Sequence, residues 1–206
     1  QTWILRADQP PVEALKTGAD AAICGDCPLR GDHGRARGCY VNVHWAPTQV
    51  WKAWQLGRYP DISDDLELIT ALHAARSVRL GAYGDPAAVP AAVLRAIVAN
   101  AANWTGYTHQ WRQRPDLKDL CMASVDTHEE WEEAKASGWR TFRGIASVED
   151  LATAEISCPA SKEAGHRTTC EQCNLCNGAR ELDRRKDIAI VVHGTGANHA
   201  RKVVQG

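Results

Sequence analysis

The sequence lacks any apolar run near the roughly 20 residues that a membrane-crossing helix needs. Residues 1–11 also lack the basic start and the apolar centre of a secretory signal. We therefore expect a cytoplasmic protein without a membrane segment. With a net charge of only −1, the chain also lacks the broad positive surface typical of proteins that bind nucleic acid or anionic membranes.

Phenylalanine and methionine are nearly absent, with one residue of each, whereas tryptophan occurs eight times. A Trp side chain usually keeps one edge near a polar partner, so we expect several of them to line a cleft or to pack beside a cofactor. A chain of 206 residues can bury a core without disulfides and fits one domain. We therefore interpret residues 1–206 as a single α/β domain.

Short apolar segments alternate with helical patterns along most of the chain. The expected strands are residues 2–5, 40–44, 78–83, 104–109, 120–125, 140–145, 154–157 and 188–193. The expected helices are residues 47–55, 61–75, 89–101 and 128–137. This alternation predicts parallel strands joined by right-handed crossovers. An open sheet and an incomplete barrel both satisfy the pattern, and we favour a partial (β/α) barrel with parallel strands and cysteine-rich loops that bind clusters.

In such folds the loops at the carboxyl ends of the strands gather on one face, where ligands bind. Polar residues follow this rule here. Gly84-Asp85, Thr108-His109, Ser124 to Asp126, and His193-Gly194 each stand at or near the end of an expected strand. Turns and helix caps use the same residue types, so each of them taken alone has a structural explanation as well.

Eight cysteines form the most distinctive pattern, and seven of them fall into two groups. The first group lies in residues 24–39 and the second in residues 158–176. The members are Cys24, Cys27 and Cys39 in the first, and Cys158, Cys170, Cys173 and Cys176 in the second. Without a secretory signal, clustered cysteines favour metal binding over disulfides.

The second group combines C-x2-C-x2-C with a remote Cys158-Pro159. A C-x2-C turn directs two thiolates at one metal centre. A third Cys at the same interval adds a third thiolate to that centre, as a cubane iron–sulfur cluster requires. Bacterial ferredoxin-type ligation also places a proline after a remote Cys. A structural zinc site with four thiolates is the competing interpretation. We favour a [4Fe–4S] cluster held by all four cysteines.

The first group has three cysteines, which leaves one position of a cluster free. That position is open to a substrate, a cofactor, or a ligand such as His33 or His44. A four-thiolate site that adds Cys121 is the alternative. Cys121 lies inside the apolar segment 120–125, which favours the role of a small buried hydrophobic residue.

A nucleic-acid interface is a further possibility that we do not favour. Aromatic and basic residues mix at residues 104–114, and basic residues lie in the first cysteine loop; such a mixture can stack bases and follow a single strand. The residues concerned are Trp104, His109, Trp111, Arg112, Arg114, Arg30, Arg35 and Arg37. A near-neutral net charge favours ordinary surface arginines instead.

Several short motifs, in the same order, resemble the phage-encoded "gene product 88"-type proteins and, more distantly, the radical S-adenosylmethionine (SAM) enzymes. They are Cys27-Pro28, Gly38-Cys39-Tyr40, Val78-Arg79-Leu80 ahead of Gly84-Asp85, Tyr107-Thr108, Ala123-Ser124-Val125, and Cys158-Pro159 ahead of the cysteine triplet. The resemblance implies a partial (β/α) barrel with an iron–sulfur cluster at its mouth, in a bacterial or phage-infected host.

By the same resemblance, Cys24, Cys27 and Cys39 would hold a cluster whose open iron meets the amino and carboxylate groups of SAM. Gly84 and Asp85 would meet the SAM amino group, and Ser124 would contact the ribose. The chain departs from the C-x3-C-x2-C spacing usual in radical SAM enzymes, because its third Cys is distant.

We therefore expect an iron–sulfur protein with two [4Fe–4S] clusters. One cluster has an open iron site for redox or radical SAM-like chemistry on a small-molecule substrate, or with a redox partner. Two alternatives stay open: a structural-zinc protein that binds nucleic acid, and a simple electron carrier without a substrate pocket.

Overall fold

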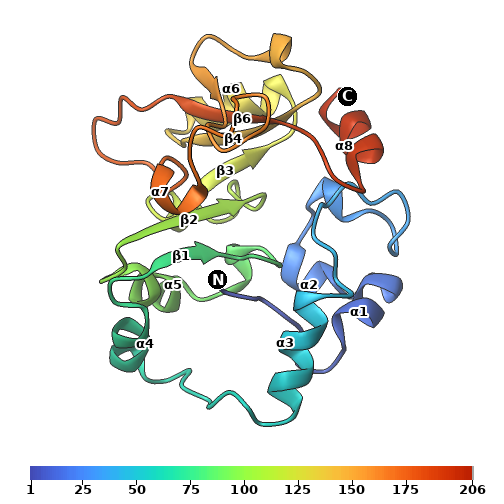
Figure 1. The fold of residues 1–206 in the computed structure, drawn as a ribbon, viewed down its shortest axis with the longest axis vertical. Coiled ribbons are helices and arrows are strands. Elements are labelled where there is room, and N and C mark those ends of the chain that lie inside the picture. Colours follow the sequence, from blue (N-terminus) through green and yellow to red (C-terminus); the bar gives the residue numbers. More distant parts are fainter. Residues whose placement is uncertain (206) are drawn as a thin grey trace.

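Six parallel strands form one open sheet in the computed structural model, which describes residues 1–205 (Figure 1). The strands are β1 (Ser77–Leu80), β2 (Asn103–Thr108), β3 (Met122–Val125), β4 (Thr141–Ile145), β5 (Glu155–Ser157) and β6 (Asp187–Val191). Their order across the sheet is β1-β2-β3-β4-β6-β5, and every neighbouring pair is parallel. The predicted α/β class with parallel strands is confirmed, and the open sheet is consistent with a partial barrel.

The helices lie on both sides of this sheet. They are α1 (Pro11–Thr17), α2 (Ala21–Cys24), α3 (Ala46–Gln55), α4 (Leu66–His73), α5 (Ala91–Val98), α6 (His128–Ala136), α7 (Cys170–Cys173) and α8 (Ala197–Val204). In Figure 1, α1 to α3 and α8 stand together on one side, and α4 and α5 stand beside β1. The N-terminal helices and α8 are therefore neighbours, and Cys24 of α2 and Ala200 of α8 line the same cavity.

The main core lies between the sheet and α4, α5 and α6. Because successive strand residues point to opposite faces, one set of side chains packs against these helices. Leu80, Leu94, Val125 and Trp139 are among its buried members. Burial of each such side chain contributes about 1.5–3 kcal/mol to stability. The alternate strand residues therefore point to the opposite face of the sheet.

Two expected strands are not formed. Residues 40–44 form loop and turn. The Arg37 guanidinium donates hydrogen bonds to the carbonyls of Cys39 and Val41 at 3.2 and 2.7 Å, so these carbonyls do not pair with a strand. The side chain of Asn42 then accepts a hydrogen bond from the His44 amide at 3.0 Å and turns the chain. In residues 2–5, only Trp3 forms a bridge, a parallel one to Tyr83.

Local signals shorten two further elements. β1 ends at Leu80 rather than at residue 83, because Gly81 takes a left-handed φ of 65° and turns the chain. α4 begins at Leu66 rather than near residue 61. Its N-cap is Asp65, whose side chain accepts a hydrogen bond from the Leu68 amide at 2.8 Å.

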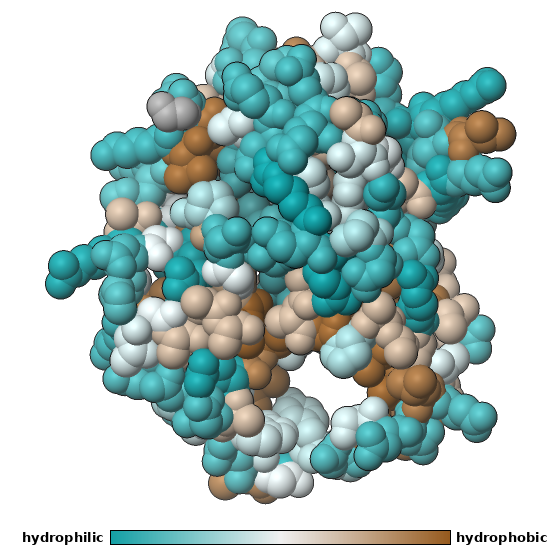
Figure 2. Space-filling model, turned by 180° about the vertical axis from the view of Figure 1, so that it is seen from behind, coloured by the Kyte–Doolittle hydropathy of each residue, from teal (hydrophilic) through white to brown (hydrophobic). Residues whose placement is uncertain are grey.

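None of the helices in residues 1–205 has the length and apolar character needed to cross a bilayer. Figure 2 shows apolar side chains gathered in the lower half of the rear face, around an opening. This lower part is built from α3, α4 and the segment between them (Figure 1). Its exposed large apolar residues are Trp54, Leu56, Tyr59, Leu66, Leu68 and Leu72.

Candidate functional site: a cleft shared by two cysteine groups

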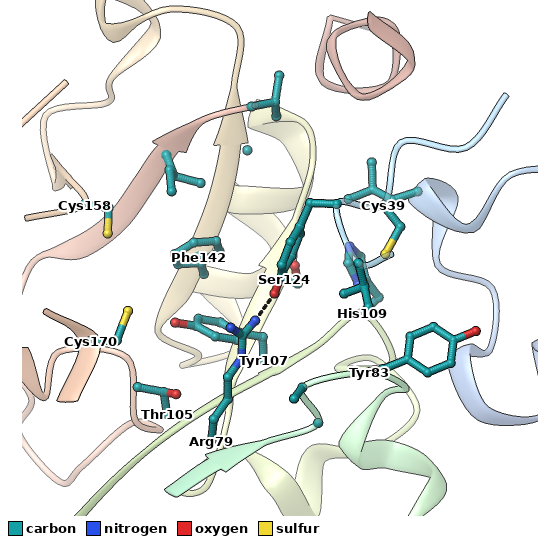
Figure 3. A pocket seen from close by; sticks show the side chains of 18 of the residues that line it. Cys39, Arg79, Tyr83, Thr105, Tyr107, His109, Ser124, Phe142, Cys158 and Cys170 are labelled. Atoms are coloured by element: carbon teal, nitrogen blue, oxygen red, sulfur yellow. Dashed lines mark hydrogen bonds between the residues drawn. The ribbon is translucent and has the colours of Figure 1, made fainter. Parts of the chain in front are cut away.

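A cleft of about 830 Å³ lies on the face of the sheet opposite to α4, α5 and α6. Alternate residues of the strands line it, among them Arg79 of β1, Tyr107 of β2 and Phe142 of β4 (Figure 3). Cysteines of both groups line it too: Cys24, Cys27 and Cys39 of the first, and Cys158 and Cys170 of the second. The fold thus brings two groups that are over a hundred residues apart in sequence to one cavity.

The four cysteines of the second group surround a smaller pocket of their own. Cys158, Cys170, Cys173 and Cys176 all line it. Cys158 directly follows β5 and extends its pairing, since its amide donates to the Ala189 carbonyl at 2.7 Å. Cys170 and Cys173 are the two ends of the single-turn helix α7. The predicted ligand set is therefore assembled at one place.

Buried hydrogen bonds hold the end of this loop. The Gly106 amide of β2 donates to the Cys176 carbonyl at 3.0 Å. The guanidinium of Arg140, which is 2% exposed, donates to the carbonyls of Leu175, Asn177 and Lys186. Cys176 itself is 7% exposed. Its position is thus set by the sheet rather than by the loop alone.

The first group forms between α2 and the loop that follows it. Cys24 ends α2, and Cys27 precedes a short 3-10 turn. The Leu29 carbonyl of that turn accepts the Cys39 amide at 2.8 Å, which brings the third cysteine back beside the pair. The Val41 amide lies near the Cys39 sulfur, and amides that donate to sulfur are a recurring feature of cluster sites.

One strand, β2, contacts both cysteine groups. Tyr107 packs beside Cys176 of the second group, and its ring lies on Phe142 with centroids 4.5 Å apart. His109, which directly follows β2, lies near Cys27 of the first group. Residues two apart on a strand face the same side. The cleft-facing residues at the end of β2 therefore lie near both cysteine groups.

Burial and neighbouring charge perturb the titratable groups of the cleft. Burial raises the pKa of Cys176 to about 12 and raises the pKa of the Cys24 and Cys39 thiols as well. Burial alone would lower the pKa of His109, but the charges of Cys27 and Asp126 outweigh it and raise that pKa well above its ordinary value. Without a bound cation, buried thiols of this kind are neutral and weak nucleophiles.

The three residues that the resemblance assigns to SAM, Gly84, Asp85 and Ser124, all line the cleft. Gly84 has a φ of 80°, and a Cβ there would lie 2.6 Å from the Ile4 Cβ, so the local backbone requires glycine. The Asp85 carboxylate accepts the amides of Ala87 and His109 at 2.9 and 2.8 Å. These contacts give Asp85 a structural role, and the SAM-binding role of the three residues stays a prediction.

Replacing Asp85 by alanine should lower the free energy of unfolding by about 2–4 kcal/mol, because it removes a cap and leaves the His109 amide without its acceptor. Asp85 is 8% exposed, so water replaces the lost partner poorly. Urea denaturation measures the effect. Asp65→Ala is the matched control, because it removes the exposed cap of α4 and should cost about 1 kcal/mol. Equal losses in the two variants would contradict the structural role.

Other candidate residues lie elsewhere. Cys121 is fully buried in the main core, where a Cβ on Gly106 would lie 2.9 Å from its sulfur, and it lines neither pocket. The favoured interpretation of Cys121 as a small buried hydrophobic residue is confirmed, and the four-thiolate alternative loses its fourth member. His33 lies 3.4 Å from Asp32, with its side chain 60% exposed, and His44 is exposed. Neither histidine lines the cleft.

The expectation that several tryptophans line a cleft is wrong, because no Trp lines this one. Trp111 and Trp139 are buried in the main core, and the Trp104 indole donates to the Leu120 carbonyl at 2.9 Å. These rings fill the space under the helices instead of lining the cleft. Arg79, Tyr40, Tyr83 and Tyr107 provide the polar and aromatic lining instead.

The arginines of the suspected nucleic-acid surface are largely paired. Arg112 bonds to Glu133 and Glu130, and Arg114 bonds to Asp116 at 2.8 Å. Arg37, in the first cysteine loop, binds backbone carbonyls. Trp111, at 2% exposure, cannot stack on a base without unfolding its surroundings.

All eight cysteines are free of disulfides. Within residues 1–205, no three Cys, His, Asp or Glu side chains lie close enough together to hold a single metal ion. Comparison of the chain with protein-family models, with curated proteins and with solved structures found no match.

Proposed function

We propose that the protein binds two [4Fe–4S] clusters, one in each cysteine group, and carries out redox chemistry in the cleft that the two groups share. The observation that carries the proposal is the second group. Its four cysteines, from the end of β5 and from α7 and its loop, line one small pocket. Four thiolates placed around an inorganic core are the ligand set of a cubane cluster.

Groups beside this pocket would interact with a bound cluster. The amides of Ala160 and Ser161 lie near the Cys158 sulfur, and Tyr107 packs beside Cys176. Hydrogen bonds to sulfur tune a bound cluster, whose contribution would be one-electron transfer. Cys158 and Cys176 are buried, at 8% and 7% exposure, whereas Cys170 is exposed, so the pocket has one side open to solvent.

In the first group, three cysteines face the cleft, and one position of a bound cluster would lack a thiolate. The 830 Å³ cavity beside it has room for a small molecule. Gly84, Asp85 and Ser124 lie in the same cavity, which keeps SAM among the ligands to test. We place the protein in a reducing cytoplasm, bacterial or of a phage-infected host, where thiols stay free to bind metal.

A structural-zinc protein that binds nucleic acid is the less favoured alternative. Four thiolates in a tetrahedral array also form structural zinc sites, so metal and sulfide analysis decides between zinc and a cluster for the second group. The paired arginines and the buried Trp111 argue against a nucleic-acid surface. A simple electron carrier explains the cysteines but does not require a cleft of this size.

Anaerobic purification followed by metal and acid-labile sulfide analysis tests the proposal. We expect a brown protein with about eight iron and eight sulfide per chain and an EPR signal after reduction. A colourless protein with stoichiometric zinc would contradict it. A change in the EPR signal on addition of SAM would identify an open iron in the first cluster, and an unchanged signal would favour a cluster without an open site.

A further inference from the structure

His109 occupies a place in the cleft that neither the cysteine spacing nor the resemblance assigns. It directly follows β2, and its amide is fixed by Asp85 at 2.8 Å. Its Nε2 atom lies 3.3 Å from Oδ2 of Asp126, the residue that follows β3. The side chains of His109 and Asp126 are 18% and 6% exposed. An imidazole with a buried Nε2 atom thus lies between two neighbouring strand ends.

The ring also lies beside the first cysteine group. His109 lies close to Cys27 and Cys39, and all three residues line the cleft together with Cys24. Figure 3 shows the ring next to the Cys39 side chain. The first group therefore presents three sulfurs and one imidazole to the same space, and the imidazole comes from a different part of the chain.

The contact with Asp126 is not a well-formed structural hydrogen bond. Nε2 of His109 and Oδ2 of Asp126 are both buried, and neither has a correctly aligned hydrogen-bond partner in the described part of the chain. Buried polar groups are nearly always paired, so an unpaired couple needs an explanation. A histidine that binds a metal through one nitrogen usually donates its other N–H to a carboxylate. Asp126, with Oδ2 3.3 Å from Nε2 of His109, is placed to accept that N–H when the other ring nitrogen binds a metal.

We infer that His109 is the fourth protein ligand of the first cluster, binding iron through Nδ1 while Asp126 accepts the Nε2 proton. The inference rests on the proposed function, since it needs a cluster on Cys24, Cys27 and Cys39. The assignment of Nδ1 follows because Nε2 is the nitrogen that faces Asp126. It replaces His33 and His44 as the candidate ligands from this chain.

This ligand set has a chemical consequence. With imidazole bound, all four positions of the first cluster are filled, so SAM could reach the iron only by displacing His109. A cluster with three thiolates and one imidazole also carries less negative charge than one with four thiolates, and a less negative cluster accepts an electron more easily. The site would then pass electrons rather than activate a ligand on iron.

The test uses the whole protein, purified without oxygen after growth with nitrogen-15 histidine or with unlabelled histidine. Pulsed EPR of the reduced first cluster should show a strongly coupled nitrogen whose signal changes with the label. This measurement needs no substitution, so folding of a variant does not limit it. An intact first cluster without any coupling to histidine nitrogen would overturn the inference. Absence of iron altogether would instead overturn the proposed function.

Two variants make the test specific. His109→Cys offers a fourth thiolate, so it should keep the iron of the first cluster and lose the nitrogen coupling. His44→Ala, at an exposed position in the same region, should keep both. Nitrogen coupling that persists in His109→Cys, or that disappears in His44→Ala, would assign the ligand to another residue.

Discussion

Replacing Cys176 by alanine should roughly halve the iron content, from about eight to about four atoms per chain, because the proposed second cluster would lose a ligand. We also expect a clear fall in the melting temperature of the protein purified with its clusters. The loop of Cys176 is anchored to β2 and to Arg140, so release of the cluster removes a cross-link between that loop, β5 and the sheet. Metal binding and folding are coupled in such sites. Cys170→Ala should have the same effect on iron.

The matched control is Cys121→Ala. It also removes a buried sulfur, but from the main core on the other face of the sheet. It should keep all of the iron and lose only the stability that a small core cavity costs. Iron and sulfide analysis, together with thermal denaturation, separates the two variants. Unchanged iron in both Cys176→Ala and Cys170→Ala would refute the assignment of the second group.

The second large effect concerns stability. Replacing Arg143 by methionine should lower the free energy of unfolding by about 3–5 kcal/mol, because it leaves the Glu155 carboxylate buried without its partner. Arg143 of β4 donates to Glu155 at the start of β5 through two bonds of 2.9 and 2.6 Å. The two side chains are 7% and 0% exposed. Urea denaturation with and without the substitution gives the difference.

Two comparisons give this prediction its controls. Arg95→Ala breaks the exposed pair with Asp119, whose side chains are 48% and 54% exposed, and should cost at most about 1 kcal/mol. The double variant Arg143→Met with Glu155→Leu removes both charges and should recover much of the loss. If Arg143→Met costs no more than Arg95→Ala, the pair does not stabilise the junction of β4 and β5. Glu155 lies three residues before Cys158, so the same junction also supports the second cysteine group.

A strand could be predicted wherever a short stretch of sequence by itself shows an apolar segment between turn residues. Short apolar segments bounded by turns marked β1 to β6, and the alternation with helices indicated parallel pairing. Residues 40–44 have a similar apolar content, but the Arg37 side chain donates hydrogen bonds to the carbonyls of Cys39 and Val41, which a strand would use for pairing. That competition is decided by tertiary contacts, which composition does not contain.

The cysteine groups were visible in the sequence because their spacing is short. That both would open onto one cleft was not, since it depends on where β5, α2 and α7 lie around the sheet. His109 shows the same limit. Its place at a strand end suggested a ligand-binding face, but only the fold reveals its contact with Cys27 and Asp126. His33 and His44 were closer to the cysteines in sequence and lie outside the cleft.

Tyr107 of β2 and His109, which directly follows it, are held at a fixed distance from each other by the strand. Two residues of a strand span about 6.6 Å, so the pleat sets how far apart the contacts to the two cysteine groups can stand. Inserting or deleting one residue in this strand would reverse the facing of every side chain beyond it and disconnect one group from the other. Length changes in the loops at residues 31–37 or 160–168 do not alter the strand, so they leave the distance between Tyr107 and His109 unchanged.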